Sequence, residues 1–418
     1  MAQKAIRCSF CGKEKKDVRR LVYRKDSPNH GVCICDNCIT LCKEIMAEET
    51  AKSEPAQERP LPSAADMLPR KIKAFLDENI VGQERAKIAM SVAIYNHYKR
   101  IENIKSDEKD DVALSKGNIL MIGPTGCGKT LIAQTIAKLI NVPFAVADAT
   151  TLTEAGYVGE DVENIIKALW MAADKNIEQT ERGIVCIDEI DKIATRGSGG
   201  RDVGGEGVQQ ALLKMIEAGN VTFSPDATKN RPGQQDLIRV NTTNILFIFT
   251  GAFNNLTDII EKRVGETGMG FTSDNIKKSG SDESKLLAQA TTQDIIKFGL
   301  IPEFMGRIPV IVTLDDLTED MLLDIIYKPK NSILKQYVRL FQFENIKLNV
   351  THDGQLAIVR EAIRRKSGAR GLRSIFEEVM LDIMYEIPSM DNLEEVVINE
   401  DVVLKKCDPI LHFLQSAS

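Results

Sequence analysis

Short apolar runs alternate with longer amphipathic segments from about residue 67 to residue 317. The clearest apolar runs are 117–122, 184–187 and 244–249, and the segments between them place apolar residues at helical spacing. Short runs that are apolar throughout are typical of strands buried on both faces, as in parallel sheets. The pattern predicts a large α/β domain in which helices cover both faces of a parallel sheet.

The segments on either side of this domain have other patterns. From residue 318 to 418 helical spacing dominates, with short strands predicted at 347–350 and 395–398, so we expect a smaller α-rich domain. Residues 47–66 hold three prolines, many charges and almost no bulky apolar side chain, which predicts a flexible linker. Residues 1–46 then form a separate N-terminal module.

Composition limits the class of protein. With 418 residues, 43% of them hydrophobic, the chain is long enough for about two to four domains with packed cores. No stretch approaches the roughly 18 apolar residues of a membrane helix, and the first residues lack the apolar core of a secretory signal. We therefore expect a cytoplasmic protein without a membrane partner. A net charge of −6 gives no overall attraction to nucleic acid.

The most informative motif is Gly-Pro-Thr-Gly-Cys-Gly-Lys-Thr at 123–130. It follows the predicted strand at 117–122 and precedes a helical pattern at 131–140, as a phosphate-binding loop must. In such a loop backbone N–H groups surround the β-phosphate, Lys129 reaches the β- and γ-phosphate oxygens, and Thr130 ligates Mg²⁺. The predicted nucleotide-binding residues of this motif are Gly123, Pro124, Thr125, Gly126, Cys127, Gly128, Lys129, Thr130 and Leu131.

Two acids follow the predicted strand at 184–187. Because ligands of parallel sheets bind beyond the carboxyl ends of the strands, we expect Asp188 to face the Mg²⁺ and Glu189 to polarise the attacking water. A purely structural acidic pair is the alternative. Thr250, at the end of the 244–249 run, either senses the γ-phosphate or caps its strand. The two motifs together favour nucleotide hydrolysis over binding alone.

These residues together resemble the AAA+ family of ring-forming ATPases, in which each site lies between neighbouring subunits. The resemblance implies a homohexamer in which Arg307 is the arginine finger that reaches the ATP of the next subunit. It also implies that Arg370 is the second sensor arginine, and that Ile80 and Val81 pack on adenine, which favours ATP. Without the family context, an ion pair within the chain is the alternative for Arg307. The catalytic candidates are then Lys129, Glu189 and Arg307.

Tyr157 and Val158 lie between glycines in the segment 156–159. Read alone, this segment is a turn with a half-buried tyrosine. Within the AAA+ framework it resembles the pore loop of protein-unfolding rings, where an exposed aromatic ring grips any polypeptide by apolar contact. The glycine-rich segment 195–207 resembles a second pore loop.

Met269, Gly270 and Phe271 resemble the apolar-Gly-Phe tripeptide with which such unfoldases dock a separate serine peptidase. Methionine replaces the usual branched aliphatic residue, and because it is apolar and adaptable we expect docking to survive. The basic loop at the ring entrance appears only as Lys229-Asn-Arg231, which leaves the preference for substrate tags open. Four scattered histidines give no Ser-His-Asp arrangement, so we expect peptide cleavage to come from the partner.

Six of the nine cysteines lie within the first 42 residues. Two Cys-x-x-Cys pairs, Cys8 with Cys11 and Cys35 with Cys38, supply four thiolates for a closed tetrahedral site. We therefore predict structural Zn²⁺ that the small module needs in order to fold. A redox role for one pair is the alternative. The family resemblance implies that the module dimerises and recruits protein substrates and adaptors.

The resulting prediction is an ATP-driven hexameric protein unfoldase that threads substrates through a central pore into the partner peptidase. The alternative is a nucleic-acid remodelling AAA+ ATPase with the zinc module as its DNA anchor, since basic residues cluster between Lys13 and Arg24. The acidic overall charge and the aromatic pore segment argue against that alternative. A chaperone that only binds nucleotide is a third hypothesis, and it predicts that Glu189→Gln leaves function intact.

Overall fold

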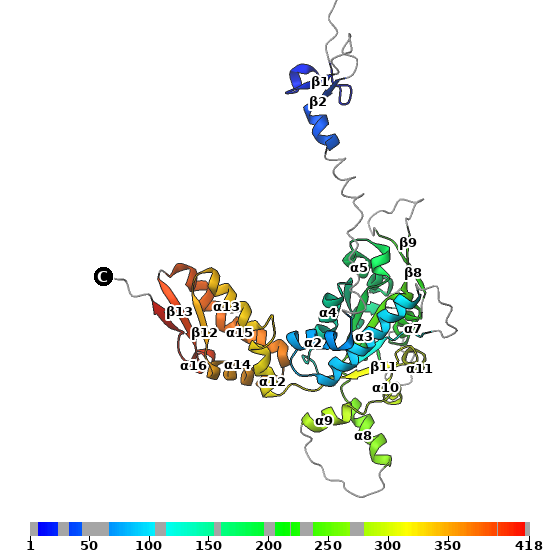
Figure 1. The fold of residues 1–418 in the computed structure, drawn as a ribbon, viewed down its shortest axis with the longest axis vertical. Coiled ribbons are helices and arrows are strands. Elements are labelled where there is room, and N and C mark those ends of the chain that lie inside the picture. Colours follow the sequence, from blue (N-terminus) through cyan, green and yellow to red (C-terminus); the bar gives the residue numbers. More distant parts are fainter. Residues whose placement is uncertain are drawn as a thin grey trace, which may run out of the picture. The chain divides into compact units, whose positions relative to one another are not determined.

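The computed structural model describes residues 7–23, 33–43, 67–104, 114–153, 160–195, 205–217, 219–225, 237–267, 280–390 and 392–413. The chain divides into two compact units, Met1–Arg59 and Pro60–Ser418, which are described separately (Figure 1).

The N-terminal unit is built around cysteine side chains. Strand β1 (Leu21–Tyr23) pairs antiparallel with β2 (Cys33–Cys35), the short helix η1 is Lys15–Asp17, and residues 36–43 are helical. Its buried cluster consists of the thiols of Cys8, Cys35 and Cys38, with three partly buried apolar side chains against them. So small an apolar core supplies little folding free energy, and a unit of this kind depends on a metal.

The second unit contains a five-stranded sheet whose neighbouring strands are all parallel. The order across the sheet is β11 (Val310–Thr313), β3 (Ile119–Ile122), β10 (Leu246–Gly251), β7 (Ile184–Asp188) and β4 (Phe144–Asp148). The three apolar runs that the sequence identified are the three central strands. The predicted fold class is confirmed, and the parallel arrangement brings the ends of β3, β7 and β10 to one edge.

Alternate residues of the central strands pack into different cores. Ile119 and Met121 of β3 belong to one buried cluster, and Leu120 and Ile122 belong to the other. The first cluster is completed by α2 (Pro69–Asn79), α3 (Glu84–Ile104) and α4 (Lys129–Ile140). The second is completed by α5 (Glu163–Ala172), α7 (Gly205–Ile216), α8 (Leu256–Thr267), α9 (Gly280–Leu287), α10 (Thr292–Phe298) and α11 (Pro302–Met305). Each fully buried Ile or Leu contributes about 1.5–3 kcal/mol, so both faces stabilise the sheet.

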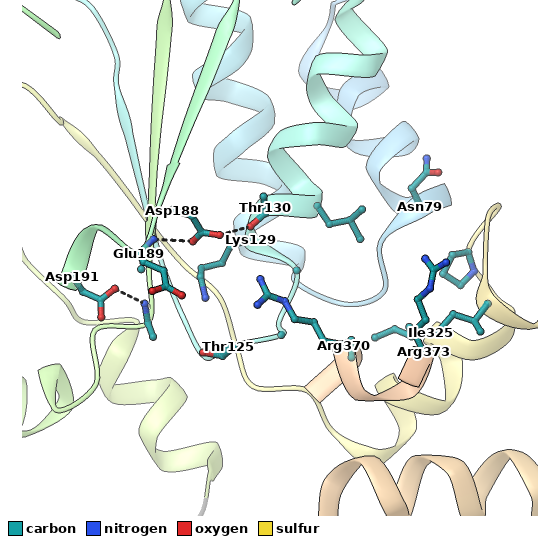
Figure 2. Close-up of a pocket in the computed structure, with 18 of the residues that line it drawn as sticks. Asn79, Thr125, Lys129, Thr130, Asp188, Glu189, Asp191, Ile325, Arg370 and Arg373 are labelled. Carbon is teal, nitrogen blue, oxygen red and sulfur yellow. Dashed lines mark hydrogen bonds between the residues drawn. The ribbon is translucent and has the colours of Figure 1, made fainter. Parts of the chain in front are cut away.

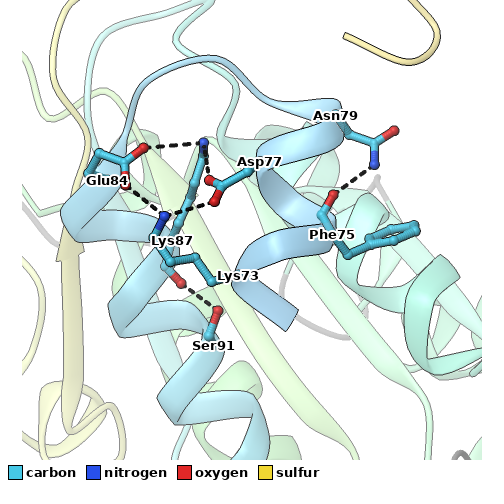
Figure 3. Close-up of polar contacts among 7 residues, drawn as sticks. All are labelled: Lys73, Phe75, Asp77, Asn79, Glu84, Lys87 and Ser91. Atoms are coloured by element: carbon cyan, nitrogen blue, oxygen red, sulfur yellow. Dashed lines mark hydrogen bonds and ion pairs between the residues drawn. The ribbon is translucent and has the colours of Figure 1, made fainter. Parts of the chain in front are cut away.

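A partly buried charge cluster joins α2 to α3 (Figure 3). The Lys87 side chain is only 2% exposed, and its Nζ lies 2.8 Å from Oδ1 of Asp77. Lys73 Nζ lies 2.8 Å from Oδ2 of Asp77 and 2.8 Å from a carboxylate oxygen of Glu84. Burial disfavours the charged Asp77, but hydrogen bonds from the two lysines outweigh it and hold the pKa of Asp77 below its usual value. The cluster fixes the elbow between the helices, where Asn79 ends α2.

Residues after 318 form a smaller, mainly helical region with a sheet of three strands. Strand β12 (Lys347–Val350) runs parallel to β13 (Leu393–Ile398), which pairs antiparallel with β14 (Ile410–Phe413). The helices are α12 (Glu319–Tyr327), α13 (Ile333–Phe343), α14 (His352–Arg364), α15 (Gly368–Glu386) and α16 (Glu400–Val403). The two expected strands are present. Strand β14 was not expected. Ile410 and Phe413 are 45% and 52% exposed, and only Leu411 is partly buried.

The remaining short elements connect the larger ones. They are α6 (Ile177–Thr180), β5 (Leu152–Thr153), β6 (Glu160–Asp161), β8 (Asn220–Phe223), β9 (Ile238–Asn241), η2 (Ala149–Thr151), η3 (Ile190–Ile193), η4 (Thr242–Asn244) and η5 (Ile387–Ser389). Within the described parts of the chain, no helix is both long and apolar enough to cross a membrane.

Candidate functional site

A cavity of about 590 Å³ lies at the edge of the sheet where β7 and β10 end and α4 begins (Figure 2). One side is formed by the phosphate-loop motif and by the residues that follow the two strands. The other side comes from the α-rich region, with α12, α13, their connection and the first turns of α15. The lining residues from the α-rich region are Ile325, Pro329, Asn331, Ser332, Ile333, Ala369, Arg370 and Arg373.

The phosphate-loop motif has the backbone that its glycines predict. Gly126 and Gly128 have φ values of +84° and +102°, in the left-handed region that side chains disfavour. A Cβ on Gly126 would also lie 3.2 Å from the carbonyl oxygen of Ser367 and 3.3 Å from Cα of Gly368. The loop thus packs closely against the start of α15, and this contact brings Arg370 to the cavity. Because α4 begins at Lys129, its N-terminal N–H groups point toward the site.

The Lys129 side chain lies inside the loop. Its Nζ donates hydrogen bonds to the carbonyl oxygens of Gly123 at 2.7 Å and Pro124 at 2.8 Å, and the residue is only 8% exposed. Charged phosphate oxygens are stronger acceptors than these neutral carbonyls. A phosphate bound in the loop therefore offers the ammonium group a better partner at the same place.

Asp188 is the polar centre of the site. Its Oδ2 accepts a hydrogen bond from Thr130 Oγ1 at 3.0 Å, and its Oδ1 accepts from Thr250 Oγ1 and, at 3.0 Å, from the Glu189 backbone N–H. The carboxylate and the Thr130 hydroxyl are hard oxygen donors of the kind that Mg²⁺ prefers, so the donor set fits this ion. Thr250 is fully buried and lines no part of the cavity. It contacts Asp188 from behind and fixes the orientation of the carboxylate.

Glu189 is exposed, lines the cavity, and has a φ of +56°. This conformation costs a non-glycine residue about 1–3 kcal/mol, and such strain concentrates at functional sites. Among the described residues, none donates a hydrogen bond to its carboxylate, which is therefore available to a water molecule. The next turn adds Asp191, whose Oδ1 accepts from the Ala252 backbone N–H at 3.2 Å.

Several lining residues were missed by the sequence analysis. Arg373 lies one helical turn after Arg370, so the spacing i, i+3 was a signal that would have placed both on one face of α15. Asp191 lies in η3 whereas Asp188 ends β7, so helical spacing gave no signal for it. Asn331 and Ser332 lie in the connection between α12 and α13 and had no local signal.

Six predicted residues do not line the cavity of this chain. Three belong to the phosphate loop, namely Gly123, Pro124 and Cys127, and three lie elsewhere, namely Arg307, Ile80 and Val81. Arg307 is half exposed, and its Nε and Nη2 donate to Oε1 of Glu217 at 3.0 and 2.8 Å. Ile80 is buried in the core under α2 and α3, and Val81 is half-buried. Neither of them lines the cavity, whereas the preceding residue, Asn79, does.

Other predictions fall on segments outside the described residues. These are Tyr157 and Val158, Met269, Gly270 and Phe271, the basic segment Lys229–Arg231, the linker at 47–66 and most of the glycine-rich segment 195–207. Their flanks are described: β5 and β6 lie on either side of the tyrosine segment, and α8 and α9 lie on either side of the methionine segment.

The four predicted zinc ligands come together in the N-terminal unit. The Sγ atoms of Cys8, Cys11, Cys35 and Cys38 all lie within 4.8 Å of one another. Burial disfavours the thiolate of Cys8, but hydrogen bonds from the backbone N–H groups of Cys11, Phe10 and Cys35 outweigh it and lower the pKa of this thiol to about 6. Four cysteines at this separation fit Zn²⁺, which binds thiolates in a closed tetrahedron. The other cysteines of this unit, at 33 and 42, are not part of the cluster.

Comparison with models of known protein families matches three segments of the chain. Residues 6–48 match the ClpX C4-type zinc finger, and they include all four clustered cysteines. Residues 114–311 match the AAA domain of the Cdc48 subfamily, which covers the phosphate loop and Asp188. Residues 317–399 match the C-terminal D2-small domain of ClpB protein and include Arg370. The matches follow the same order as the cysteine cluster, the parallel sheet and the α-rich region.

Proposed function

We propose that this chain, which belongs to the ClpX-type AAA+ ATPases, is an ATP-dependent protein unfoldase. In this proposal six copies form a ring, draw substrate proteins through a central pore, and deliver them to a ClpP-type serine peptidase. The observation that carries the proposal is the cavity in which Thr130 and Asp188 meet and to which the α-rich region contributes Arg370.

The residues of the cavity would have different roles in ATP hydrolysis. Thr130 and Asp188 would hold a Mg²⁺ ion, which when bound neutralises charge on the β- and γ-phosphate oxygens. Lys129 moves from the loop carbonyls to those phosphate oxygens. Glu189, with its free carboxylate, orients the attacking water and accepts its proton. Arg307 of one subunit contributes positive charge to the site of the next.

The position of Arg370 at the start of α15 supports a mechanism in which ATP hydrolysis moves the α-rich region. Arg370 lies in the first turn of α15, whose start contacts the phosphate loop at Gly126. Loss of the γ-phosphate removes a charged partner from Arg370 while this backbone contact remains. We infer that the α-rich region turns about this contact as the nucleotide changes. Val81, which is half-buried beside the cavity-lining Asn79, would contact the adenine, whereas Ile80 packs in the core.

We infer from the family resemblance which segments would hold the substrate polypeptide and which would dock the peptidase. Tyr157 and Val158 would hold the polypeptide in the pore, and residues 269–271 would dock the peptidase. The zinc-bearing unit would bind substrates and adaptors. Because an aromatic ring holds a chain by apolar contact, the motor does not need to read sequence while it pulls.

A degradation assay tests this function directly. The purified protein, a ClpP-type peptidase and a tagged fluorescent substrate of high stability are mixed with ATP or with ADP. We expect fluorescence to be lost only with ATP, and fragments to appear only when the peptidase is also present. Tyr157→Ala should slow the loss of fluorescence, and Tyr157→Phe should retain it.

The same preparation distinguishes the nucleic-acid alternative. ATP hydrolysis is measured with an unfolded polypeptide and, separately, with single-stranded DNA. Stimulation by the polypeptide supports the unfoldase. Stimulation by DNA alone, together with an unchanged fluorescent substrate, would refute the unfoldase and favour a nucleic-acid remodelling enzyme.

A further inference from the structure

Gln209 of α7 is a fully buried amide that joins three segments of the chain. Its Nε2 donates hydrogen bonds to the carbonyl oxygens of Ile193 at 2.8 Å and Gly299 at 3.3 Å. Its Oε1 accepts a hydrogen bond from the Ile301 backbone N–H at 2.8 Å. A buried amide group that is left without a hydrogen-bond partner costs free energy of folding. This arrangement therefore favours one relative position of the three segments, in which every hydrogen bond is made.

Two of these segments carry proposed catalytic residues. Ile193 ends the short helix η3, which begins directly after Glu189. Ile301 is the N-cap of α11, and Arg307 follows that helix closely. The amide of Gln209 therefore lies between the acid that acts in the subunit's own site and the arginine that the subunit would present to its neighbour.

Backbone contacts reinforce the same junction. Thr195 donates hydrogen bonds to the Gly299 carbonyl oxygen from its N–H and from its hydroxyl, both at 3.0 Å. Gly299 has a φ of +129°, and a Cβ at this position would lie 2.5 Å from the carbonyl oxygen of Thr195. The segment that follows Glu189, which consists of η3 and the residues up to Thr195, thus contacts the backbone of the segment that leads to Arg307.

Helix α7 also contacts the segment 299–307 through a residue near its C-terminal end. Glu217, directly after the last turn of α7, accepts the two hydrogen bonds from Arg307. It lies eight residues after Gln209, which is about 12 Å along a helix. Gln209 and Glu217 therefore form hydrogen bonds with the segment 299–307 near both of its ends.

We propose that Gln209 is a positioning residue that couples the acidic turn of one subunit's site to the arginine which that subunit lends to the next. Movement at Glu189 is passed through η3 and the Gln209 amide to the segment of Arg307. The inference rests on the proposed role of Arg307 in hydrolysis, but it does not depend on protein unfolding. Gln209 does not line the cavity, and acts only through other residues.

The first test compares two neighbouring glutamines of α7. Gln209→Met keeps the length of the side chain and removes its donor and acceptor, and Gln210→Met makes the same change at an exposed position. We expect Gln209→Met to lower kcat for ATP at least about tenfold with KM nearly unchanged, since misplacement of a catalytic group by 1 Å can cost far more. Gln210→Met should match the wild type. Equal kcat values for the two variants would overturn the proposal.

A double-mutant cycle tests whether Gln209 acts through Arg307. If it does, Gln209→Met combined with Arg307→Ala should hydrolyse ATP about as slowly as Arg307→Ala alone. If the fold-reduction in kcat of the double variant equals the product of the two single reductions, Gln209 acts independently, for example through stability, and the coupling is overturned. If Arg307→Ala hydrolyses ATP normally, both the finger role and this inference fail, whereas the degradation assay of the wild type still judges the unfoldase.

A second variant covers the case in which Gln209→Met does not fold. Gln209→Glu has the same shape, and its protonated carboxyl can donate to Ile193 and accept from Ile301, but its single O–H cannot also donate to Gly299 as the amide does. Burial favours the protonated form. Relative to the wild type at each pH, we expect this variant to hydrolyse ATP several-fold better at pH 6 than at pH 8. A deficit that does not change with pH would contradict the positioning role.

Discussion

The Thr130 hydroxyl lies 3.0 Å from a carboxylate oxygen of Asp188, although 58 residues separate the two in the chain. Strands β3 and β7 bring them together, because both strands end at the same edge of the sheet. The other oxygen of Asp188 accepts a hydrogen bond from Thr250, which β10 supplies between those two strands. Three adjacent strands thus determine where a metal ion can bind.

Thr250→Val should weaken the metal site without touching the cavity wall. The change preserves shape and removes the hydroxyl that fixes one oxygen of Asp188. Outer contacts of this kind are worth about 10–100-fold in metal affinity or activity. We expect the Mg²⁺ concentration for half-maximal ATP hydrolysis to rise by about tenfold, as measured by a Mg²⁺ titration at saturating nucleotide.

The matched control for that variant is Thr180→Val. Thr180 is also fully buried and donates one hydrogen bond, to the carbonyl oxygen of Asn176, but it lies outside the cavity. Both variants should lose about 1 kcal/mol of unfolding free energy. If both shift the Mg²⁺ titration equally, the effect is one of stability and Thr250 has no special role.

Glu189→Gln should separate nucleotide binding from hydrolysis. The amide keeps the size of the side chain but cannot accept a proton from the attacking water. We expect the variant to bind ATP with wild-type affinity and to reduce kcat by about 100-fold or more, in the range of general-base contributions. Nucleotide binding and phosphate release are measured on the same sample. Glu163→Gln, at an exposed position on α5, is the control, and normal turnover by Glu189→Gln would exclude Glu189 from the mechanism.

Local sequence patterns predicted the side of the cavity that would bind phosphate. Gly126 and Gly128 are required by positive φ values, and Asp188 ends an apolar strand, so both signals are contained within a few residues. The opposite wall depends on how the α-rich region packs on Gly126, and no short segment encodes that contact. Asn331 and Ser332 were missed for this reason. Ile80, expected at the adenine, lies in the core because α2 and α3 pack on the sheet through it.

The cysteine cluster predicts a selective loss of zinc. Cys8→Ser removes one of four thiolates whose sulfur atoms lie within 4.8 Å, whereas Cys42→Ser changes a thiol outside the cluster. We expect one Zn²⁺ per chain in the wild type and in Cys42→Ser, and a large loss of bound zinc in Cys8→Ser. Metal analysis after dialysis gives the stoichiometry. Equal zinc contents in the two variants would show that these four cysteines are not the ligands.

The surroundings of Lys116 predict that stability depends on pH. Its Nζ lies 4.5 Å from the centre of the Phe247 ring and donates to the Thr242 carbonyl oxygen at 2.8 Å. Burial and, as a smaller effect, the nearby Arg100 together lower the pKa of Lys116 to about 7. The unfolded chain, in which a lysine has a pKa of about 10.4, therefore binds more protons between pH 7 and pH 10. The contribution of this residue to the unfolding free energy should rise with pH in that window, by at most about 1.4 kcal/mol per unit.

Lys116→Met should flatten that pH dependence, since it removes the titrating group and keeps an apolar stem against Phe247. Denaturant unfolding between pH 7 and pH 10 gives the slope for the variant and the wild type. Lys99→Met serves as the control, because Lys99 also lies over an aromatic ring, that of Tyr95, but is exposed. We expect Lys99→Met to keep the wild-type slope. An identical slope in Lys116→Met would mean that the buried ammonium does not titrate in this range, and that the carbonyl of Thr242 and the ring of Phe247 compensate fully for the lost hydration.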